Sequence, residues 1–300
     1  MLGSHAMESN QILAFVLAGG EGTRLRPLTR ERAKPALAFA GGYRLIDFVL
    51  SNLVNSDVGS IYVLAQYKPH PLLEHIAAVW GPRVRVLLPR AGNGRGYAGT
   101  AAAVQQNLDA VARDRPELVA VFAADHVYRM DVRQMVAFHR ARRAQVSVAA
   151  VAVAVDSARS LGVIAARRDG RVLEFQEKPL HPRPLPRDAG RAYASMGNYL
   201  FEPGVLAQAL REMAQGGGTD FGRHVLPRLP QRYRVFAYDL AENVLPGVRP
   251  YEERAYWRDV GTLPALIAAR KDVQGVRPRF KLRNPSWPIR GVSGEERDAA

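Results

Sequence analysis

Continuous apolar runs alternate with helix-like stretches through the first half of the chain. Residues 12–19 form an apolar run that ends in glycine, and residues 118–125 form one that ends in aspartate. Such runs are typical of strands buried inside a parallel sheet. Further strands are predicted at 60–66 and 83–88, and helices at 43–55, 71–79, 101–113 and 131–143. This alternation predicts an α/β fold, a Rossmann-like, mainly parallel sheet flanked by helices.

The second half of the chain has shorter elements and more strands. Residues 161–166 and 171–176 flank an Arg-Asp-Gly turn, which predicts a β-hairpin. Other strands are predicted at 146–155, 194–201 and 234–237, helices at 203–214 and 260–271, and a proline-rich loop at 181–187. We expect one domain at 12–275. Residues 1–11 are expected to be a tag remnant or disordered arm, and 276–300 an irregular tail.

Composition excludes several classes of protein. The chain has 300 residues, enough for one large domain, and 47% of them are apolar. It contains no cysteine, which excludes disulfide frameworks, zinc–thiolate sites, iron–sulfur clusters and cysteine nucleophiles. No apolar run approaches the roughly 18 residues of a membrane span, and the N-terminus lacks a signal-peptide pattern. We therefore expect a cytoplasmic protein with no membrane partner.

The positive charge is large, with 42 basic against 28 acidic residues and a net charge of +14. A charge of this size first suggests a nucleic-acid partner. The arginines are spread along the whole chain, however, and no nucleic-acid-binding signature is present. We expect an arginine-biased, solvated surface and no nucleic-acid partner, with some cations serving small anionic substrates. Lysines number only five, so each of them merits individual inspection.

A glycine-rich loop at residues 17–25, Leu-Ala-Gly-Gly-Glu-Gly-Thr-Arg-Leu, follows the first predicted strand. Glycines there let backbone N–H groups approach and cradle an anion. The loop lacks the Gly-Lys-Ser/Thr ending of a Walker loop, and Leu25 stands where a dinucleotide fingerprint needs glycine. A structural turn is the alternative, but Arg24, Arg32 and Lys34 beside the loop favour a polyphosphate site. Because ligands bind at the carboxyl ends of parallel strands, this loop and Asp125 are expected to share one crevice.

The loop together with Arg32-Ala-Lys-Pro35 resembles the signature of sugar-1-phosphate nucleotidylyltransferases. An ordered set of further motifs over residues 12–290 is similar to ADP-glucose pyrophosphorylases. The set comprises Arg44-Leu-Ile-Asp-Phe48, Leu50-Ser-Asn52, Gln66-Tyr67, Gly99-Thr100-Ala101, Asp125-His-Val-Tyr128, Glu177-Lys-Pro179, Ser195-Met-Gly197, Asp220-Phe-Gly222, Trp257-Arg-Asp-Val-Gly-Thr262 and Trp287-Pro-Ile-Arg290. The resemblance implies the nucleotide-diphospho-sugar transferase fold, with β-rich sugar-binding insertions in a catalytic domain at 12–275.

The family's reaction requires little covalent chemistry from the protein. The resemblance implies that a sugar 1-phosphate oxygen attacks the α-phosphate of ATP, releasing pyrophosphate and, as the expected product, ADP-glucose. Positioning and charge neutralisation carry most of such a reaction. The implied partners are ATP, or another NTP, and a sugar or pseudo-sugar 1-phosphate. The implied cofactor is Mg²⁺, and a homo-oligomer is an open expectation.

The resemblance also implies roles for individual residues. Arg24, Lys34 and Asp125 would be catalytic, and Asp125 and Asp259 would hold Mg²⁺. The nucleotide would be bound by Leu17, Ala18, Gly19, Gly20, Gly22, Thr23, Gln66, Gly99 and Thr100. The sugar phosphate would be bound by Tyr97, Gly162, Glu177, Lys178, Ser195, Gly197, Asp220 and Trp257. Structural alternatives are a core position for Trp257, a helix N-cap for Asp220, an ordinary strand position for Ser195 and a surface position for Lys178.

Some features depart from the family pattern. Full-length members continue into a left-handed β-helix, whose hexapeptide repeats this sequence does not contain, so allosteric control and the usual tetramer are in doubt. Glu31, Ala98, Ala102 and His224 replace residues common in the family. Two alternatives therefore stay open: an enzyme that activates a cyclitol phosphate in secondary metabolism, or a non-catalytic regulatory subunit. The retained basic and acidic motif residues argue against the second.

Overall fold

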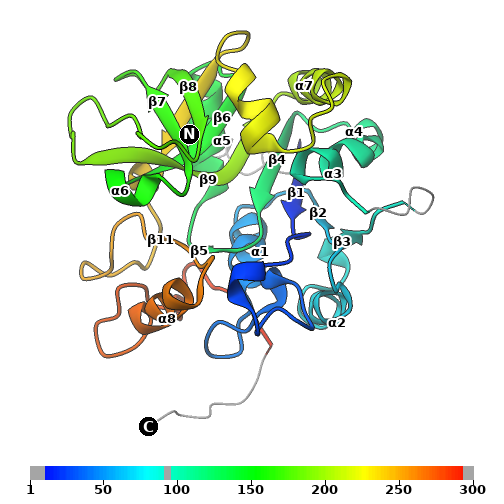
Figure 1. The fold of residues 1–300 in the computed structure, drawn as a ribbon. Helices are drawn as coiled ribbons and strands as arrows, with labels where there is room; N and C mark the ends of the chain where they lie inside the picture. Colours follow the sequence, from blue (N-terminus) through cyan, green and yellow to red (C-terminus); the bar gives the residue numbers. More distant parts are fainter. Residues whose placement is uncertain (1–10, 91–95, 293–300) are drawn as a thin grey trace, which may run out of the picture.

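A computed structural model describes residues 11–90 and 96–292, so residues 1–10 of the predicted N-terminal arm and the last eight residues lie outside the described part. Seven strands form the path of the central sheet (Figure 1). Their order is β10 (Val235–Asp239), β6 (Val146–Ala154), β9 (Arg191–Phe201), β4 (Leu118–Ala123), β1 (Ile12–Leu17), β2 (Ser60–Leu64) and β3 (Val84–Leu87). Along this path only β9 is antiparallel to its neighbours. The predicted mainly parallel sheet is confirmed.

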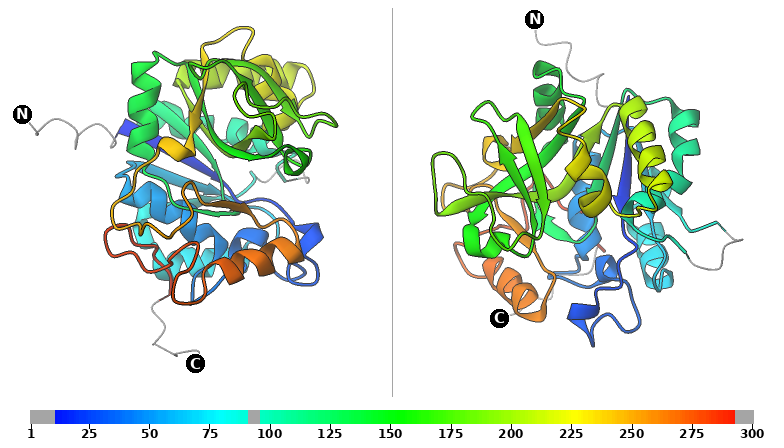
Figure 2. Two further views of the ribbon diagram at one scale, coloured as in Figure 1. Left: turned by 90° about the vertical axis from the view of Figure 1, so that its left-hand side faces the viewer. Right: turned by 45° about the horizontal axis from the view of Figure 1, so that its top comes forward.

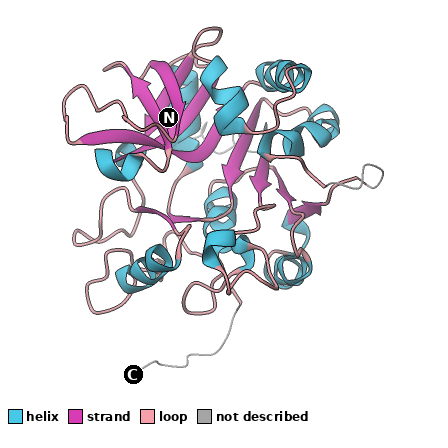
Figure 3. Ribbon diagram, in the orientation of Figure 1, coloured by secondary structure: helices cyan, strands magenta, loops and turns pink. Residues whose placement is uncertain are grey.

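The two faces of β1 bury different cores. Ala14 and Val16 pack with α1 (Leu45–Asn55), α2 (His70–Val79) and α5 (Val132–Ala141). Leu13 and Phe15 face α3 (Thr100–Gln106), α4 (Leu108–Asp114) and α7 (Pro203–Gln215). Figures 2 and 3 show helices on both sides of the sheet. Since successive strand residues point to opposite faces, the uninterrupted apolar run follows from burial on both sides.

The predicted hairpin is present beside β9, formed by β7 (Gly162–Ala166) and β8 (Val172–Glu177). A short helix, α6 (Val155–Ala158), follows β6. The single helix predicted over 101–113 is wrong in one respect, because it breaks at Asn107 into α3 and α4. There the Asn107 amide donates to the carbonyl of Ala103, so the side chain competes for a helical backbone acceptor.

A second, two-stranded sheet was not predicted. It pairs β5 (His126–Tyr128) with β11 (Trp257–Asp259) in antiparallel register, with Asp259 opposite His126. The last helix, α8 (Leu263–Asp272), follows β11 directly. β5 follows directly after the end of β4 at the carboxyl edge of the main sheet, and β11 comes from far along the chain. This small sheet therefore brings residues from the end of the chain to the edge where the glycine loop lies.

Residues 276–292 contain no helix or strand, and they are packed against the domain. Phe280, Trp287 and Ile289 are all buried. The Trp287 indole donates to the side-chain oxygen of Asn52 on α1, at 3.2 Å. Across the described part of the chain, no helix is long and apolar enough to cross a membrane.

Candidate active site

A cavity of about 330 Å³ opens at the carboxyl ends of β1 and β4. The predicted site residues that line it are Leu17, Gly19, Gly20, Lys34, Gln66, Tyr97, Gly99, Thr100, Asp125 and Asp220. The parallel register explains the arrangement, because Leu17 is paired with Ala123, so the loops after both strands emerge together. The expectation that the glycine loop and Asp125 share one crevice is confirmed.

Gly22 gives the glycine loop its shape. It has a left-handed φ of 64°, and a Cβ there would lie 2.9 Å from the Cβ of Lys34. The Thr29 hydroxyl donates to the Gly22 carbonyl at 2.9 Å, which fixes the returning chain. The loop can therefore fold back onto Lys34 only with glycine at this position. Gly22 and Thr23 do not themselves line the cavity, whereas Gly19 and Gly20 do.

The centre of the site is a buried lysine between two acids. The Nζ atom of Lys34 lies 2.8 Å from Oδ2 of Asp125 and 3.3 Å from Oδ1 of Asp259. Burial by itself lowers the pKa of Lys34, yet the two carboxylates outweigh it and raise that pKa above its ordinary value. Burial likewise opposes the charge of Asp125, but Lys34 and His126 hold the pKa of Asp125 at about 2. Lys34 and Asp125 are therefore both charged at neutral pH.

Arg24 completes this cluster from the exposed side. A Cβ on Gly261 would lie 2.9 Å from Nη2 of Arg24 and 3.1 Å from Oδ1 of Asp259. The guanidinium and the carboxylate thus flank Gly261, and a side chain at 261 would displace them. Gly261 was not among the site residues predicted from the sequence. Its only signal was its place in the motif that also contains Asp259.

The acid pair fits a divalent cation. Asp125, His126 and Asp259 each offer a ligand atom, and these atoms lie within 4.8 Å of one another. The ammonium of Lys34 bonds to both carboxylates, which shows that their oxygens converge on a single positive charge. Mg²⁺ prefers carboxylate oxygens to imidazole nitrogen. The donor set therefore suits Mg²⁺ held by the two acids.

The predicted sugar-phosphate residues lie beside this cavity and most do not line it. Glu177 ends β8, and its Oε2 atom lies 2.6 Å from where a Cβ of Gly222 would be. Gly197, with a φ of 71°, would place a Cβ 3.0 Å from that of Ala123 and 3.5 Å from the His126 ring. Burial raises the pKa of Glu177, and Asp220 adds to this while Lys178 opposes it. This group thus adjoins the end of β4.

Several predicted ligands also have structural roles. Asp220 caps the helical turn 221–225, accepting from the backbone of Arg223 through Oδ1 and from the Thr100 hydroxyl through Oδ2. The Tyr97 hydroxyl accepts from Asn107 at 3.2 Å, and the ring is buried. The N-cap alternative for Asp220 is thus observed, although the residue also lines the cavity.

Other predicted sugar ligands differ in exposure. Lys178 is exposed, with Nζ 3.7 Å from Glu177. Trp257 is buried and packs on the His126 ring at 4.9 Å, while its indole N–H has no partner among the described residues. Ser195 accepts from the backbone of Gly197 at 3.3 Å. Gly162 lies against the Phe175 ring, with Glu177 close by, so this glycine keeps space beside the acid.

Comparison with known proteins agrees with this arrangement. The family model for nucleotidyl transferases matches residues 13–275, which defines the class of enzyme. The chain is 48% identical to a glucose-1-phosphate adenylyltransferase of Thermodesulfovibrio yellowstonii, over 93% of this chain and 70% of that protein. The chain is also 48% identical to the Streptomyces avermitilis enzyme, over 95% of this chain and 72% of that protein. It is 45% identical to the Thermus thermophilus enzyme, over 93% of this chain and 71% of that protein. The chain belongs to the glucose-1-phosphate adenylyltransferase family, and the predicted resemblance is confirmed.

Proposed function

We propose that the protein transfers the adenylyl group of ATP to glucose 1-phosphate, giving ADP-glucose and pyrophosphate. The observation that carries this proposal is Lys34, held between Asp125 and Asp259 at the edge of a cavity that the glycine loop lines. Cations and metal-binding acids beside an open backbone cradle suit a triphosphate. The choice of ATP and of glucose 1-phosphate rests on the names of the relatives.

In this reaction an oxygen of the sugar phosphate forms a bond to the α-phosphorus, and the bond to the bridging oxygen of pyrophosphate breaks. The backbone of Gly19 and Gly20 would hold the triphosphate. Arg24 would neutralise it with the bidentate geometry of a guanidinium, and Lys34 with a compact point charge. Lys178, exposed at the end of β8, would meet the phosphate of the sugar. Orientation and fixed charge thus supply most of the rate enhancement.

Asp125 and Asp259 would hold Mg²⁺, which, when bound, neutralises phosphate charge. Their own contribution is to hold one carboxylate oxygen each close to the same point. The low pKa of Asp125 ensures that its oxygen stays ionised at neutral pH. Glu177, half-buried beside Asp220, would accept hydroxyl groups of the sugar. Gly197 and Gly162 would leave room for the sugar ring.

Pyrophosphate release tests the proposal. The assay crosses ATP, CTP, GTP and UTP with glucose 1-phosphate, other sugar 1-phosphates and a cyclitol 1-phosphate. We expect the fastest release with ATP and glucose 1-phosphate. Asp125→Asn should lower the rate by about a hundredfold or more, whereas Asp109→Asn, an exposed carboxylate paired with Arg90, should not. Faster release with a cyclitol phosphate would refute the acceptor, and no release by the folded protein would refute catalysis.

A further inference from the structure

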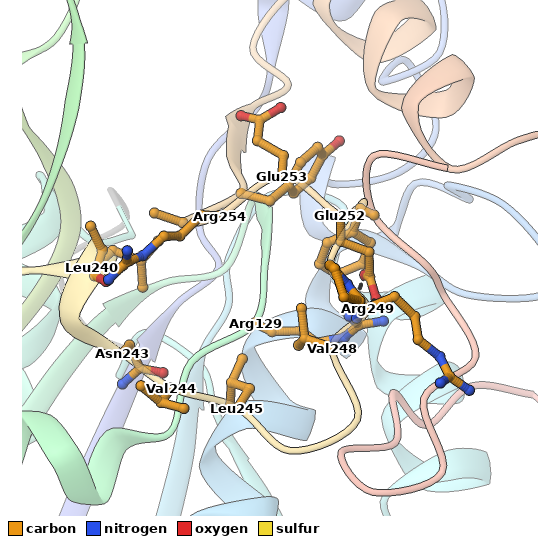
Figure 4. Close-up of a pocket in the computed structure, with 15 residues that line it drawn as sticks. Arg129, Leu240, Asn243, Val244, Leu245, Val248, Arg249, Glu252, Glu253 and Arg254 are labelled. Atoms are coloured by element: carbon orange, nitrogen blue, oxygen red, sulfur yellow. Dashed lines mark hydrogen bonds and ion pairs between the residues drawn. The ribbon is translucent and has the colours of Figure 1, made fainter. Parts of the chain in front are cut away.

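A second cavity, of about 400 Å³, shares no lining residue with the candidate active site. It lies between the segment 240–256 and Phe280 of the packed tail. In Figure 4, Leu245 lies on one side of the cavity and Arg249 and Glu252 on the other, with Arg129 between them. Apolar side chains make up much of the lining, and two of them leave apolar surface in solvent, Val244 at 72% and Val248 at 39% exposed.

The guanidinium of Arg129 is buried in this lining and only partly satisfied. Its Nη1 atom donates to Glu252 at 3.1 Å, and its Cζ atom lies 4.2 Å from the centroid of the Phe280 ring. Its Nε and Nη2 atoms are buried and have no hydrogen-bond partner among the described residues. Burial lowers the pKa of Arg129, and Glu252 opposes this only in part. The side chain is 3% exposed, and Arg129 is one of the residues that line the cavity.

The two free nitrogens define the ligand's chemistry. Nε and Nη2 form one edge of the guanidinium, a planar fork that matches both oxygens of a carboxylate. Phe280 covers the face of the group and Glu252 occupies the Nη1 end, which leaves this edge for a further acceptor. A buried N–H group without an acceptor is unfavourable. The edge therefore favours a planar anion over a neutral group.

The acids of the cavity do not repel such an anion strongly, because each of them already has basic or N–H partners. Glu252 accepts two backbone N–H groups besides the Arg129 guanidinium. Glu253 pairs with Arg258 and Arg279, which keep its pKa low although burial opposes this. Arg249, exposed at the rim, has no ion-pair partner in the described part of the chain. The lining thus offers uncompensated positive charge.

We propose that this cavity binds a small organic carboxylate. Its two oxygens accept from Nε and Nη2 of Arg129, and its apolar body packs against Leu245 and Val248. The volume and the apolar lining with one converging polar group are those of small-molecule sites. Arg129 directly follows β5, and the segment that lines the cavity leads into β11. A bound ligand would therefore contact the segment after β5 and the segment before β11, the two strands whose pairing brings Asp259 to the active site.

Direct binding tests this site without reference to the transfer reaction. Ligand-observed NMR measures 4-methylpentanoate, and its amide serves as the neutral probe of equal shape. We expect the carboxylate to bind about tenfold or more tightly than the amide. Val244→Trp fills the mouth and leaves the Arg129–Glu252 pair intact, so it should weaken binding at least about tenfold. Val276→Trp adds the same side chain at a residue that is 96% exposed and outside the cavity, and should not weaken it.

A double variant tests the anchoring group. Arg129→Met and Glu252→Gln are combined, because removing one partner alone would leave a buried charge unpaired. If the double variant folds, its preference for carboxylate over amide should disappear. The proposal is overturned if the wild type shows no saturable carboxylate binding, if Val244→Trp and Val276→Trp bind equally, or if the folded double variant keeps the preference. If the double variant does not fold, the comparison of the two tryptophan variants decides.

Discussion

Replacing Lys34 with methionine removes an ammonium held between two acids while keeping a long side chain. Nζ lies 2.8 Å from Asp125 and 3.3 Å from Asp259, and the lysine side chain is 7% exposed. Without it, the two carboxylates lose the ammonium that contacts them both. The pKa of Asp125, about 2 with Lys34 in place, should then rise. We expect the variant to be less stable at neutral pH.

The size of the effect follows from the pKa of Asp125. A change from 3.8 to about 2 corresponds to about 2.5 kcal/mol at 1.36 kcal/mol per unit. Because the carboxylate is 33% exposed, solvent screening reduces this to about 1–2 kcal/mol. A depressed carboxyl pKa stabilises the fold above its unfolded value, near 4, and this stabilisation is lost as pH falls through the folded value. The difference between wild type and variant should therefore shrink from pH 4 to pH 2.

Urea unfolding at pH 7 and pH 3, with and without Mg²⁺, measures this difference. Lys34→Met should lower the urea midpoint at unchanged m-value. Lys68→Met, an exposed lysine 3.8 Å from Glu31, is the matched control and should change stability by less than about 0.5 kcal/mol. Mg²⁺ should stabilise Lys34→Met more than the wild type, because the acids of the variant lack the ammonium of Lys34. Equal stability of the two variants, or equal stabilisation of wild type and Lys34→Met by Mg²⁺, would refute the reasoning.

Three further predictions concern the acceptor site and the tail. Lys178→Ala should raise the KM for glucose 1-phosphate about tenfold or more in initial-rate assays, whereas Lys68→Ala should not; equal effects would exclude a phosphate contact. Because burial raises the pKa of Glu177, this KM should rise as pH falls through a value above that of an ordinary glutamate. An unchanged pH profile in Glu177→Gln would contradict this. Trp287→Phe removes the donor to Asn52 and should cost about 1 kcal/mol in urea unfolding, and an unchanged midpoint would show that the bond adds nothing.

The central sheet was predictable because its strands are buried on both faces. Uninterrupted apolar runs such as 12–17 and 118–123 identify them without any periodicity. The residues that follow these runs mark the carboxyl edge, so the shared crevice of Gly19 and Asp125 could be inferred as well. Because the chain has only five lysines, a lysine beside the glycine loop indicated a phosphate site, and Lys34 does line the cavity.

The small sheet could not be predicted, because β5 and β11 have three residues each, too few for a hydrophobic period. The packing of residues 276–292 against the domain could not be predicted for a related reason. Phe280, Trp287 and Ile289 are buried individually, and their spacings of seven and two residues do not repeat a single helix or strand period. Likewise, the sequence suggested Lys34 as a phosphate ligand, but its contacts with both acids depend on the unpredicted pairing of β5 with β11.

The register of that pairing decides whether the acids meet. Asp259 lies opposite His126, and because side chains alternate between faces, a slip of one residue would turn Asp259 away from Lys34. Three-residue strands specify register weakly by themselves. On the β5 side, Asn52 holds the chain in place, because its amide donates to the Tyr128 carbonyl and its oxygen accepts from the Met130 backbone. Trp287 donates to the same oxygen, so the packed tail helps to hold the end of β5, the strand that follows Asp125.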